Sequence, residues 1–234
     1  VYGACSTCGE ALTLGAVMAA GGYAEHVVCV TSSHFASAEK EFRFPLDYGN
    51  QRPLSASWTV TGSGAFALGL NQKCRAHITG MTPGRIVDYG LKDSMNMGAC
   101  MAPAAADTIE RHLEDFHVQP QEYDRIITGD LGSVGQTVLI DLLREKGIDI
   151  AGRHMDCGIE IFDAEAQDTH AGGSGCGCSA VTLAAYILPK LESGEWKKVL
   201  FLPTGALLSK TSFNEGKSVP GIAHAVVLES PVVK

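Results

Sequence analysis

The stretch CSTCGEALTLGAVMAAGGYAEHVVCVTSS, residues 5–33, recurs without a gap as CSAVTLAAYILPKLESGEWKKVLFLPTGA, residues 178–206. Identical residues stand where the structure is expected to change, as in the pairs Cys5/Cys178 and Gly21/Gly194. Each copy begins with small residues, continues as an apolar helix, breaks at glycine and ends in a strand rich in β-branched residues. Because this supersecondary unit occurs only twice, it predicts a duplicated domain and not a solenoid.

Composition indicates a globular protein of one large domain or two small ones. Of the 234 residues, 45% are hydrophobic and 19% are charged, which allows a large core and argues against disorder. The net charge of −8 gives no basic surface for nucleic acid and no attraction to anionic lipid. No apolar run reaches the roughly 18–20 residues that cross a bilayer, so we expect no transmembrane segment. The chain begins at Val1 without an initiator methionine, and we expect a piece of a longer protein.

Helical and strand patterns alternate along the chain. We expect helices over 7–20, 101–117 and 134–146, and strands over 26–31, 58–61, 65–70, 123–128 and 222–228, with short strands at 78 and 86–87. Residues 32–57 resemble a long loop, and a loop of that length usually covers a site. Thr7-x-x-Glu10 has capping-box spacing, which would set Cys5 or Ser6 at a helix mouth. The alternation favours an α/β sheet with helices on both faces and one shared core.

Cys5 is the first candidate for chemistry. A thiol at a helix N-terminus faces unpaired N–H groups and the positive end of the helix dipole, which lower its pKa, and these N–H groups could form an oxyanion hole. The alternative is a small residue needed for close packing, since Cys178 holds the equivalent position. Cys5-x-x-Cys8 lacks a second pair at zinc spacing, so we predict no metal site.

Other candidates lie at the expected ends of strands. Asp130, within Gly-Asp-Leu-Gly, follows a strand where open α/β sheets place site residues, although capping the next helix is an equal alternative. His34, His170 and His224 stand in loops or at strand starts and are candidates to line a pocket. His112 and His117 lie on an acidic helix and are expected to be solvated.

Glycine-rich motifs give no cofactor site. Gly175-x-Gly177-x-x-Ala180 superficially fits a dinucleotide fingerprint, but Pro203-Thr204 stands where a ribose-binding acid is required. Glycine for tight helix packing is the simpler interpretation, and no phosphate-binding loop is present. We therefore expect no cofactor.

The repeated helix–glycine–strand unit with a cysteine at its mouth resembles the thiolase fold of thiolases and ketoacyl synthases. Within that superfamily, motifs along essentially the whole chain resemble the stage V sporulation protein AD family. They are YGACST (2–7), TSSHF (31–35), EKEFRFP (39–45), QRP (51–53), WTVTG (58–62), NMGA (96–99), APAAAD (102–107), TGDLG (128–132), HAGGSGCGC (170–178) and PGIAHA (220–225).

The resemblance implies a single thiolase-like α-β-α-β-α domain with part of its first repeat missing. Residues 1–75 would remain from the first repeat and 76–234 would form the second. Family members are usually dimers when complete, so we expect a homodimer from the full-length protein. We also expect the isolated chain to expose core surface and to be poorly soluble.

The resemblance further implies a protein of spore-forming bacteria, peripheral on the forespore and spore inner membrane. There it would belong with other SpoVA proteins to an assembly that moves dipicolinic acid, with calcium, into the spore and out at germination. This member would bind dipicolinic acid, alone or as its calcium chelate. A planar dianion needs hydrogen-bond donors, and the candidates are the N–H groups of residues 5–7 with Cys5, His34, Arg52, Asp130, His170 and His224.

Two other functions stay open. Cys5 matches the nucleophile of thiolases, which predicts an acyltransferase acting on an acyl-CoA or acyl-carrier thioester. The family's nucleophile works with groups from two later loops, where this chain has Gly129-Asp130 and Gly172-Gly173, with His170 displaced. A carboxylate in place of an imidazole would raise the pKa of the thiol, so the catalytic set is incomplete. The third possibility is a structural subunit that uses the fold as an interaction surface.

Overall fold

A five-stranded mixed sheet, in the order β4-β11-β8-β5-β6, organises the larger half of the chain. Its strands are β4 (His77–Thr82), β11 (Ala225–Glu229), β8 (Lys198–Leu202), β5 (Arg125–Thr128) and β6 (His154–Asp156). β8, β5 and β6 run parallel, and β11 is antiparallel to both of its neighbours. The computed structural model describes residues 1–42, 53–70 and 73–232, with only the backbone over 39–42. β8 and β11 are apolar and buried on both faces, as a central strand between helix layers requires.

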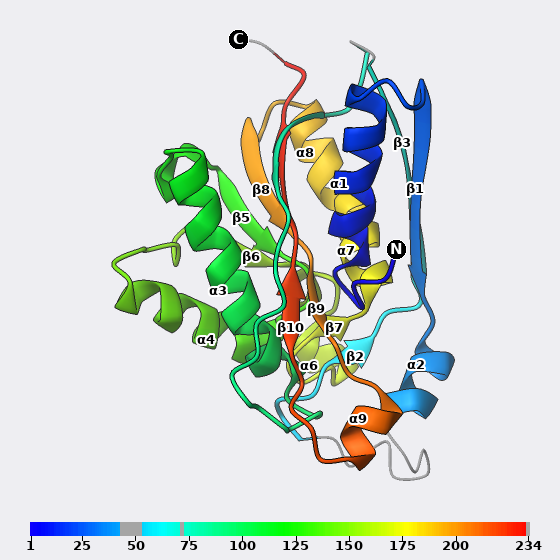
Figure 1. Cartoon of the computed structure of the whole chain (residues 1–234), viewed down its shortest axis with the longest axis vertical. Helices are drawn as coiled ribbons and strands as arrows, with labels where there is room; N and C mark the ends of the chain where they lie inside the picture. The colour runs from blue at the N-terminus through cyan, green and yellow to red at the C-terminus, as the bar shows by residue number, and fades with distance from the viewer. Residues whose placement is uncertain (43–52, 71–72, 233–234) are drawn as a thin grey trace.

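Helices cover both faces of this sheet, as the alternation of elements predicts (Figure 1). On one face lie α3 (Met97–Asp115) and α4 (Gly132–Glu145). On the other lie α1 (Thr7–Ala20) and a continuous helical run made of α7 (Cys176–Thr182), the π-helical η3 (Leu183–Ile187) and α8 (Leu188–Glu192). Beyond these inner helices, β1 (His26–Ser33) and β3 (Gly62–Gly69) pair antiparallel as a second sheet. The layers are therefore helix, sheet, helix, sheet.

The internal repeat is visible as structure. The first copy folds as α1 followed by β1, and the second as the α7–α8 run followed by β8 and β9 (Thr204–Ala206). In the larger sheet β8 also pairs with β5, and β11 also pairs with β4. Within the described residues, β1 and β3 pair only with each other. Val28 and Val30 alternate along β1 with the buried Cys29 and Thr31, so they lie on its outer face and are 66% and 58% exposed.

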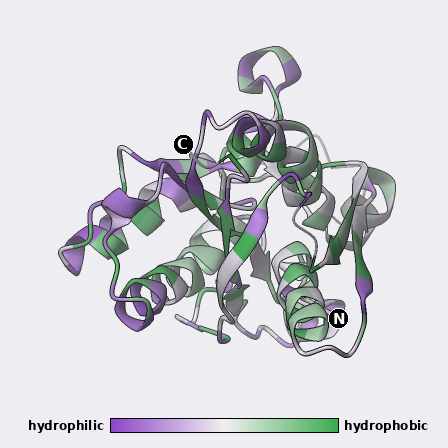
Figure 2. Cartoon of the chain, turned by 90° about the horizontal axis from the view of Figure 1, so that it is seen from above, coloured by the Kyte–Doolittle hydropathy of each residue, from purple (hydrophilic) through white to green (hydrophobic). Residues whose placement is uncertain are grey.

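The core fills the spaces between layers. Its largest fully buried side chains include Tyr123, Phe201, Met101, Ile109, Ile126 and Ile127. Figure 2 shows α1, beside the N-terminus, coloured hydrophobic over most of its length, whereas hydrophilic residues gather in the outer helices and loops. α3 and α4 approach so closely at Gly98 and Gly135 that a Cβ added to Gly135 would lie 2.8 Å from Gly98 Cα.

Several short elements were not expected. They are α2 (Phe35–Phe42), η2 (Pro120–Glu122), α5 (Cys157–Glu160), α6 (Ala164–Gln167), α9 (Lys210–Asn214) and the strand β7 (Gly173–Ser174). The strand expected over 58–61 is the shorter β2 (Trp58–Thr59), and the strand expected over 222–228 is divided into β10 (Gly221–Ala223) and β11. The long loop expected over 32–57 thus begins with a helix. Elements of two to eight residues give too few periods to register as a pattern. At 86–87 only Val87 forms a bridge, with Gly221.

The start of α3 also differs from expectation. The helix begins at Met97 and not at residue 101, because the Asn96 side chain accepts a hydrogen bond from Ala99 N–H at 3.3 Å. Asparagine is a favoured N-cap because its short side chain reaches these unpaired donors. Pro103 is tolerated inside the first turns of the helix.

The prediction that His112 is solvated is wrong. Its side chain is 0% exposed, and it bonds to Thr82 Oγ1 through Nδ1 at 2.8 Å and to the Tyr123 hydroxyl through Nε2 at 2.6 Å. It also stacks on Phe116 with ring centroids 4.5 Å apart. Burial lowers the pKa of His112 to about 4. His112 therefore joins α3 to β4 and to the start of β5 as a neutral hydrogen-bonding group.

The prediction of a capping box at the start of α1 is also wrong. Thr7 is the first helical residue and Ser6 precedes it as N-cap without a side-chain capping bond. Thr7 Oγ1 accepts from Gly3 N–H at 3.1 Å and donates to the Ala4 carbonyl at 2.7 Å. The first turn of α1 is consequently held by the chain before it, and the helix mouth carries no capping side chain from Ser6.

None of the helices in the described ranges combines the length and apolarity that a membrane span requires.

Candidate functional site

Cys5 lies at the mouth of α1, in a tight turn that the sequence builds from small residues. Ser6 Oγ donates to the Gly3 carbonyl at 2.6 Å, and Ala4 has the left-handed φ of +50°. Such a φ is strained for a residue with a Cβ and is held only where the surroundings enforce it. Gly205, in the second repeat, packs so tightly here that an added Cβ would lie 2.3 Å from the Gly3 carbonyl. The two repeat copies thus meet at Cys5.

Asp130 lies opposite Cys5, with a carboxylate that is 2% exposed and fully engaged. Thr204 Oγ1 donates to its Oδ1 at 2.9 Å, and Ser174 Oγ and Gly175 N–H donate to its Oδ2 at 3.1 and 2.9 Å. The Cys5 thiol donates a further hydrogen bond to this carboxylate. Asp130 comes from the turn after β5, so the carboxyl end of a parallel strand holds a site residue, as the sequence indicates.

The electrostatics keep Cys5 protonated. Burial, followed by the negative charge of Asp130, raises the pKa of Cys5 well above its ordinary value. Burial also raises the pKa of Asp130, against the hydrogen bonds from Gly175, Cys5, Thr204 and Ser174. The expectation that the helix mouth lowers the pKa of this thiol is therefore wrong, because desolvation and a neighbouring carboxylate outweigh the dipole. A thiol in this state donates a hydrogen bond and is a poor nucleophile.

Asp156 is a site residue that the sequence did not reveal. It ends β6 beside β5, where its carboxylate accepts from Thr128 Oγ1 at 2.6 Å and from the N–H groups of Leu131, Gly132 and Ile159 at 2.9, 3.0 and 3.2 Å. Burial raises the pKa of Asp156 to about 6. This side chain fixes the turn that carries Asp130. The rule that selected Asp130, a polar residue after a parallel strand, applies equally to Asp156 once β6 is recognised.

Three of the four remaining candidates lie in the described residues, and the contacts of His170 and His224 are with residues other than Cys5. His34 is exposed between β1 and α2. His170 Nδ1 lies 2.9 Å from the Pro53 carbonyl, and its Nε2 lies 3.2 Å from Asp168. Arg52 lies outside the described residues.

His224 packs under α1, where its carbonyl would lie 2.8 Å from a Cβ on Gly9. It is 8% exposed, its Nδ1 accepts from Gly84 N–H at 3.2 Å, and its Nε2 has no hydrogen-bond partner among the described residues.

The cysteines and glycines around the site pack closely. Cys8, Cys157 and Cys178 are buried behind Cys5, and the half-exposed Cys176 donates to the Ser32 carbonyl at 3.0 Å. Over the described ranges no group of three or more His, Cys, Asp or Glu side chains is placed to hold a metal. A Cβ on Gly177 would lie 2.5 Å from Ser33 Oγ and 2.6 Å from the Gly62 carbonyl, so close helix packing requires this glycine.

Solved structures share this architecture. The chain aligns with the tetronic acid condensing enzyme AbyA1 at a TM-score of 0.60 and 16% identity, covering 98% of this chain and 67% of that one. It aligns with 3-oxoacyl-(acyl carrier protein) synthase III, FabH, of Pseudomonas aeruginosa PAO1 at 0.60 and 13%, covering 100% and 68%. Human mitochondrial 3-ketoacyl-CoA thiolase aligns at 0.55 and 12%, covering 98% and 77%. At these identities the likeness establishes the thiolase-like fold alone.

Sequence comparison is more specific. Residues 1–229 match the family model of Stage V sporulation protein AD (SpoVAD). Over 229 residues the chain is 43% identical to Stage V sporulation protein AD of Bacillus subtilis (strain 168), covering 98% of this chain and 67% of that protein. The chain thus spans about two thirds of this relative, which agrees with a thiolase-like fold that lacks part of its first repeat. On the evidence of its sequence and its fold, the chain belongs to the stage V sporulation protein AD family of sporulation proteins.

Proposed function

We propose that this chain carries the ligand site of a SpoVA component that binds dipicolinic acid, serving its uptake during sporulation and its release at germination. Family membership supports the sporulation role. The observation that carries the binding role is the Cys5–Asp130 pair, a protonated thiol on a buried carboxylate with three other donors. This geometry suits recognition of a polar ligand better than nucleophilic catalysis.

The charge of Asp130 selects the form of ligand that fits. Dipicolinate is a planar dianion at neutral pH, and a buried carboxylate beside it costs electrostatic free energy. That cost falls if one ligand carboxyl is protonated or if a calcium ion neutralises the ligand. The N–H groups of Ser6 and Thr7, expected as ligand donors, already donate to the Gly3 and Ala4 carbonyls at 3.0 and 3.2 Å, so they are not part of this proposal. The calcium chelate or the singly protonated acid would then bind more tightly than the free dianion.

The rest of the proposal concerns the assembly. Within it, this protein would lie peripherally on the forespore and spore inner membrane with other SpoVA proteins, and the full-length protein would form a homodimer. The main competitor is an acyltransferase with Cys5 as nucleophile, supported by the position of Cys5 at a helix mouth in a thiolase-like fold. A scaffold subunit without a ligand is the third function.

Calorimetric titration of dipicolinic acid into the full-length protein, with and without calcium, tests the proposal. Cys5→Ala should weaken binding about 10-fold or more, because it removes one partner of a buried contact. Asp130→Asn should tighten binding of the free dianion and reduce the advantage of calcium, because it removes the opposing charge. Cys176→Ala is the matched control, since this half-exposed thiol bonds only to a backbone carbonyl on the described residues. Unchanged binding in both variants would move the ligand away from Cys5. No binding, together with acyl transfer to Cys5 from acyl-CoA, would establish the acyltransferase instead.

A further inference from the structure

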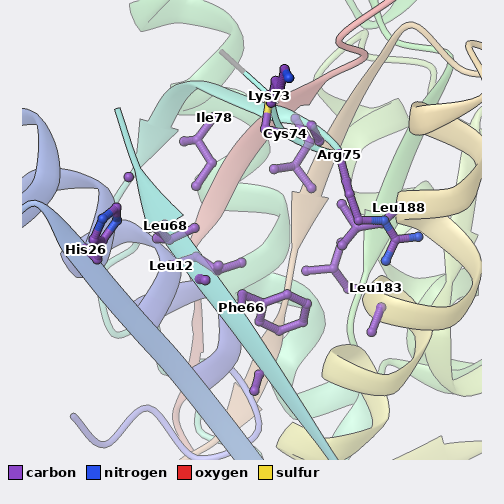
Figure 3. A pocket seen from close by; sticks show the side chains of 16 residues that line it. Leu12, His26, Phe66, Leu68, Lys73, Cys74, Arg75, Ile78, Leu183 and Leu188 are labelled. Carbon is purple, nitrogen blue, oxygen red and sulfur yellow. The ribbon is translucent and has the colours of Figure 1, made fainter. Parts of the chain in front are cut away.

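A cavity lies between the two sheets, and none of its lining residues belongs to the Cys5–Asp130 site. Its volume is about 470 Å³, within the range of roughly 300–1,000 Å³ that small-molecule pockets occupy. Its walls come from β3 of the smaller sheet, from β4 and β11 of the larger sheet, and from α1, η3 and α8 between them (Figure 3). Its apolar side chains are Leu12, Phe66, Leu68, Ile78, Leu183 and Leu188. Such a lining matches a hydrocarbon chain better than a polar ligand.

A thiol and an imidazole stand at the rim of this cavity. Cys74 lines it, and the Cys74 sulfur lies 3.5 Å from Nδ1 and 3.6 Å from Nε2 of His77. Lys73 and Arg75 flank the thiol in the sequence, and Figure 3 shows Lys73 beside Cys74, whereas the Arg75 side chain extends toward Leu188. Arg75 bonds to Glu192 at 2.9 Å, which fixes one of these cations beside the rim. A half-exposed thiol next to a base and two cations is the environment in which cysteines react.

The other cysteines lack these features. Cys8, Cys29, Cys100, Cys157 and Cys178 are buried. Cys5 and Cys176 are half-exposed, but burial raises the pKa of each and the charge of Asp130 adds to the effect. Cys74 therefore combines partial exposure, a neighbouring imidazole and an adjoining apolar cavity.

We propose that Cys74 is an S-acylation site that takes a medium- or long-chain acyl group from an acyl-CoA thioester, with the acyl chain occupying the cavity. This goes beyond dipicolinate binding and uses different residues. The apolar lining selects the hydrocarbon chain, and the cations at the rim favour a donor that carries phosphates. The product is a protein thioester whose lipid chain is stored inside the fold.

The chemistry is a thiol exchange and needs no oxidant or reductant. His77 accepts the proton of the Cys74 thiol as the sulfur attacks the carbonyl carbon of the acyl-CoA. A carbon–sulfur bond to Cys74 forms and the carbon–sulfur bond to CoA breaks. The imidazolium returns its proton to the CoA thiolate, so that free CoA leaves and one thioester replaces another.

Intact-protein mass spectrometry of the full-length protein after incubation with lauroyl-CoA tests this proposal. We expect a mass increase of one lauroyl group that hydroxylamine removes, with the modified peptide containing Cys74. Cys74→Ser should abolish the adduct, and His77→Gln should slow its formation by about 100-fold, within the usual range for loss of a general base. Ala184 lies in η3 and lines the cavity, so Ala184→Phe would place a phenyl ring inside it. This variant should slow lauroyl transfer much more than acetyl transfer. Cys5→Ser and Cys176→Ser are the matched controls and should leave the adduct intact.

The outcomes separate this site from the proposed function. An adduct on Cys5 and not on Cys74 would overturn the proposal. So would an adduct on Cys74 that forms at the same rate in His77→Gln and Ala184→Phe as in the unchanged protein. No adduct in a protein whose thermal melting is normal would overturn it as well. Dipicolinate titration of Cys74→Ser reports the first site independently, and binding there should be unchanged.

Discussion

Asp130 and the Thr204 hydroxyl are joined by two hydrogen bonds, one to the carboxylate and one from the backbone N–H. The hydroxyl donates to Oδ1 at 2.9 Å and accepts from the Asp130 backbone N–H at 3.1 Å. Because Thr204 starts β9 in the second repeat copy, this reciprocal pair ties the turn after β5 to the hairpin below α1. The orientation of Asp130 toward Cys5 therefore depends on a residue outside the turn that carries it.

Replacing Thr204 by valine keeps its shape and removes both bonds. We expect Thr204→Val to lower the free energy of unfolding by about 1–3 kcal/mol, since a buried N–H and a carboxylate oxygen lose a partner. Urea denaturation measures this loss. The internal repeat supplies the control: Thr31 is the equivalent residue, and its hydroxyl donates to the Cys176 carbonyl at the longer distance of 3.4 Å. Equal losses for Thr31→Val and Thr204→Val would contradict a special role for the reciprocal pair.

The reactivity of Cys5 should depend on Asp130. Removing the charge in Asp130→Asn lowers the pKa of Cys5, because that charge disfavours the thiolate. Alkylation of Cys5 by iodoacetamide at pH 8, followed by peptide mass spectrometry, should then be about 10-fold faster than in the unchanged protein. Alkylation of Cys74 in the same sample gives an internal reference, and its rate should not change. A slower Cys5 in Asp130→Asn would mean that the carboxylate activates the thiol.

Acid should destabilise the protein between about pH 6.5 and 4. Burial lowers the pKa of both His112 and His154 to about 4, so the unfolded chain takes up two protons in this range that the folded chain does not. Stability is therefore present above the unfolded pKa and lost as the pH falls. Asp156 acts in the opposite sense, because its pKa of about 6 lets the folded chain take up a proton first. Burial also raises the pKa of Asp130 and lowers the pKa of His224, so three histidines stand against two carboxyls and the net effect is a loss.

Thermal melting from pH 7 to pH 4.5 checks this expectation. The melting temperature should fall with pH, and the fall should be smaller in His112→Gln, which carries one titrating group fewer. Asp156→Asn should steepen it, since the opposing proton uptake is gone. A melting temperature that rises on acidification would show that the carboxyls dominate.

The contact between α3 and α4 should not tolerate a methyl group. A Cβ on Gly135 would meet Gly98 Cα and the Gly98 carbonyl oxygen at 2.8 Å, and backbone atoms in two packed helices cannot move independently. Gly135→Ala should cost about 1–3 kcal/mol of unfolding free energy, as overpacking usually does. Gly152→Ala is the control, because no atom lies within 4 Å of its Cβ position. Chemical denaturation measures the free energy of unfolding of both variants. Equal losses in Gly135→Ala and Gly152→Ala would refute the packing argument.

The outer face of β1 should promote association of the isolated chain. Val28 and Val30 are 66% and 58% exposed, and Leu14, Val17 and Met18 of α1 are 44–48% exposed. Such a patch favours self-association. Light scattering should show aggregation, and Val28→Thr with Val30→Thr should reduce it without lowering the melting temperature. A monomeric, fully soluble parent chain would contradict the expectation.

Helices and strands with a clear periodicity of their own could be predicted from the sequence. The repeat, α1 and the strand before Asp130 were predicted because each has its own periodicity or punctuation. His112 was misplaced because its burial depends on Thr82 and Tyr123, which are distant in sequence. Asp156 was missed for a similar reason: β6 has three residues and is recognisable as a strand only through its pairing with β5.

The site was predicted in part. Cys5 and Asp130 lie together, as a cysteine at a helix mouth and a carboxylate after a parallel strand indicate. The histidines were selected by their positions at chain turns, and a turn position does not say which way a ring points. The cavity beside Cys74 is formed by residues from seven separate elements, so no motif in the sequence could indicate it.

The β1–β3 sheet is built from the same unit as the larger sheet but has fewer strand partners in the described chain. Its amide protons should exchange with solvent sooner than those of β5 and β8, and heating should open it first. α1 rests on this sheet, and Cys5 sits at the first turn of α1. Any further strand that pairs with β1 or β3 would therefore also make the mouth of α1 more rigid. Ligand affinity at Cys5 would then report whether the smaller sheet has gained such a strand.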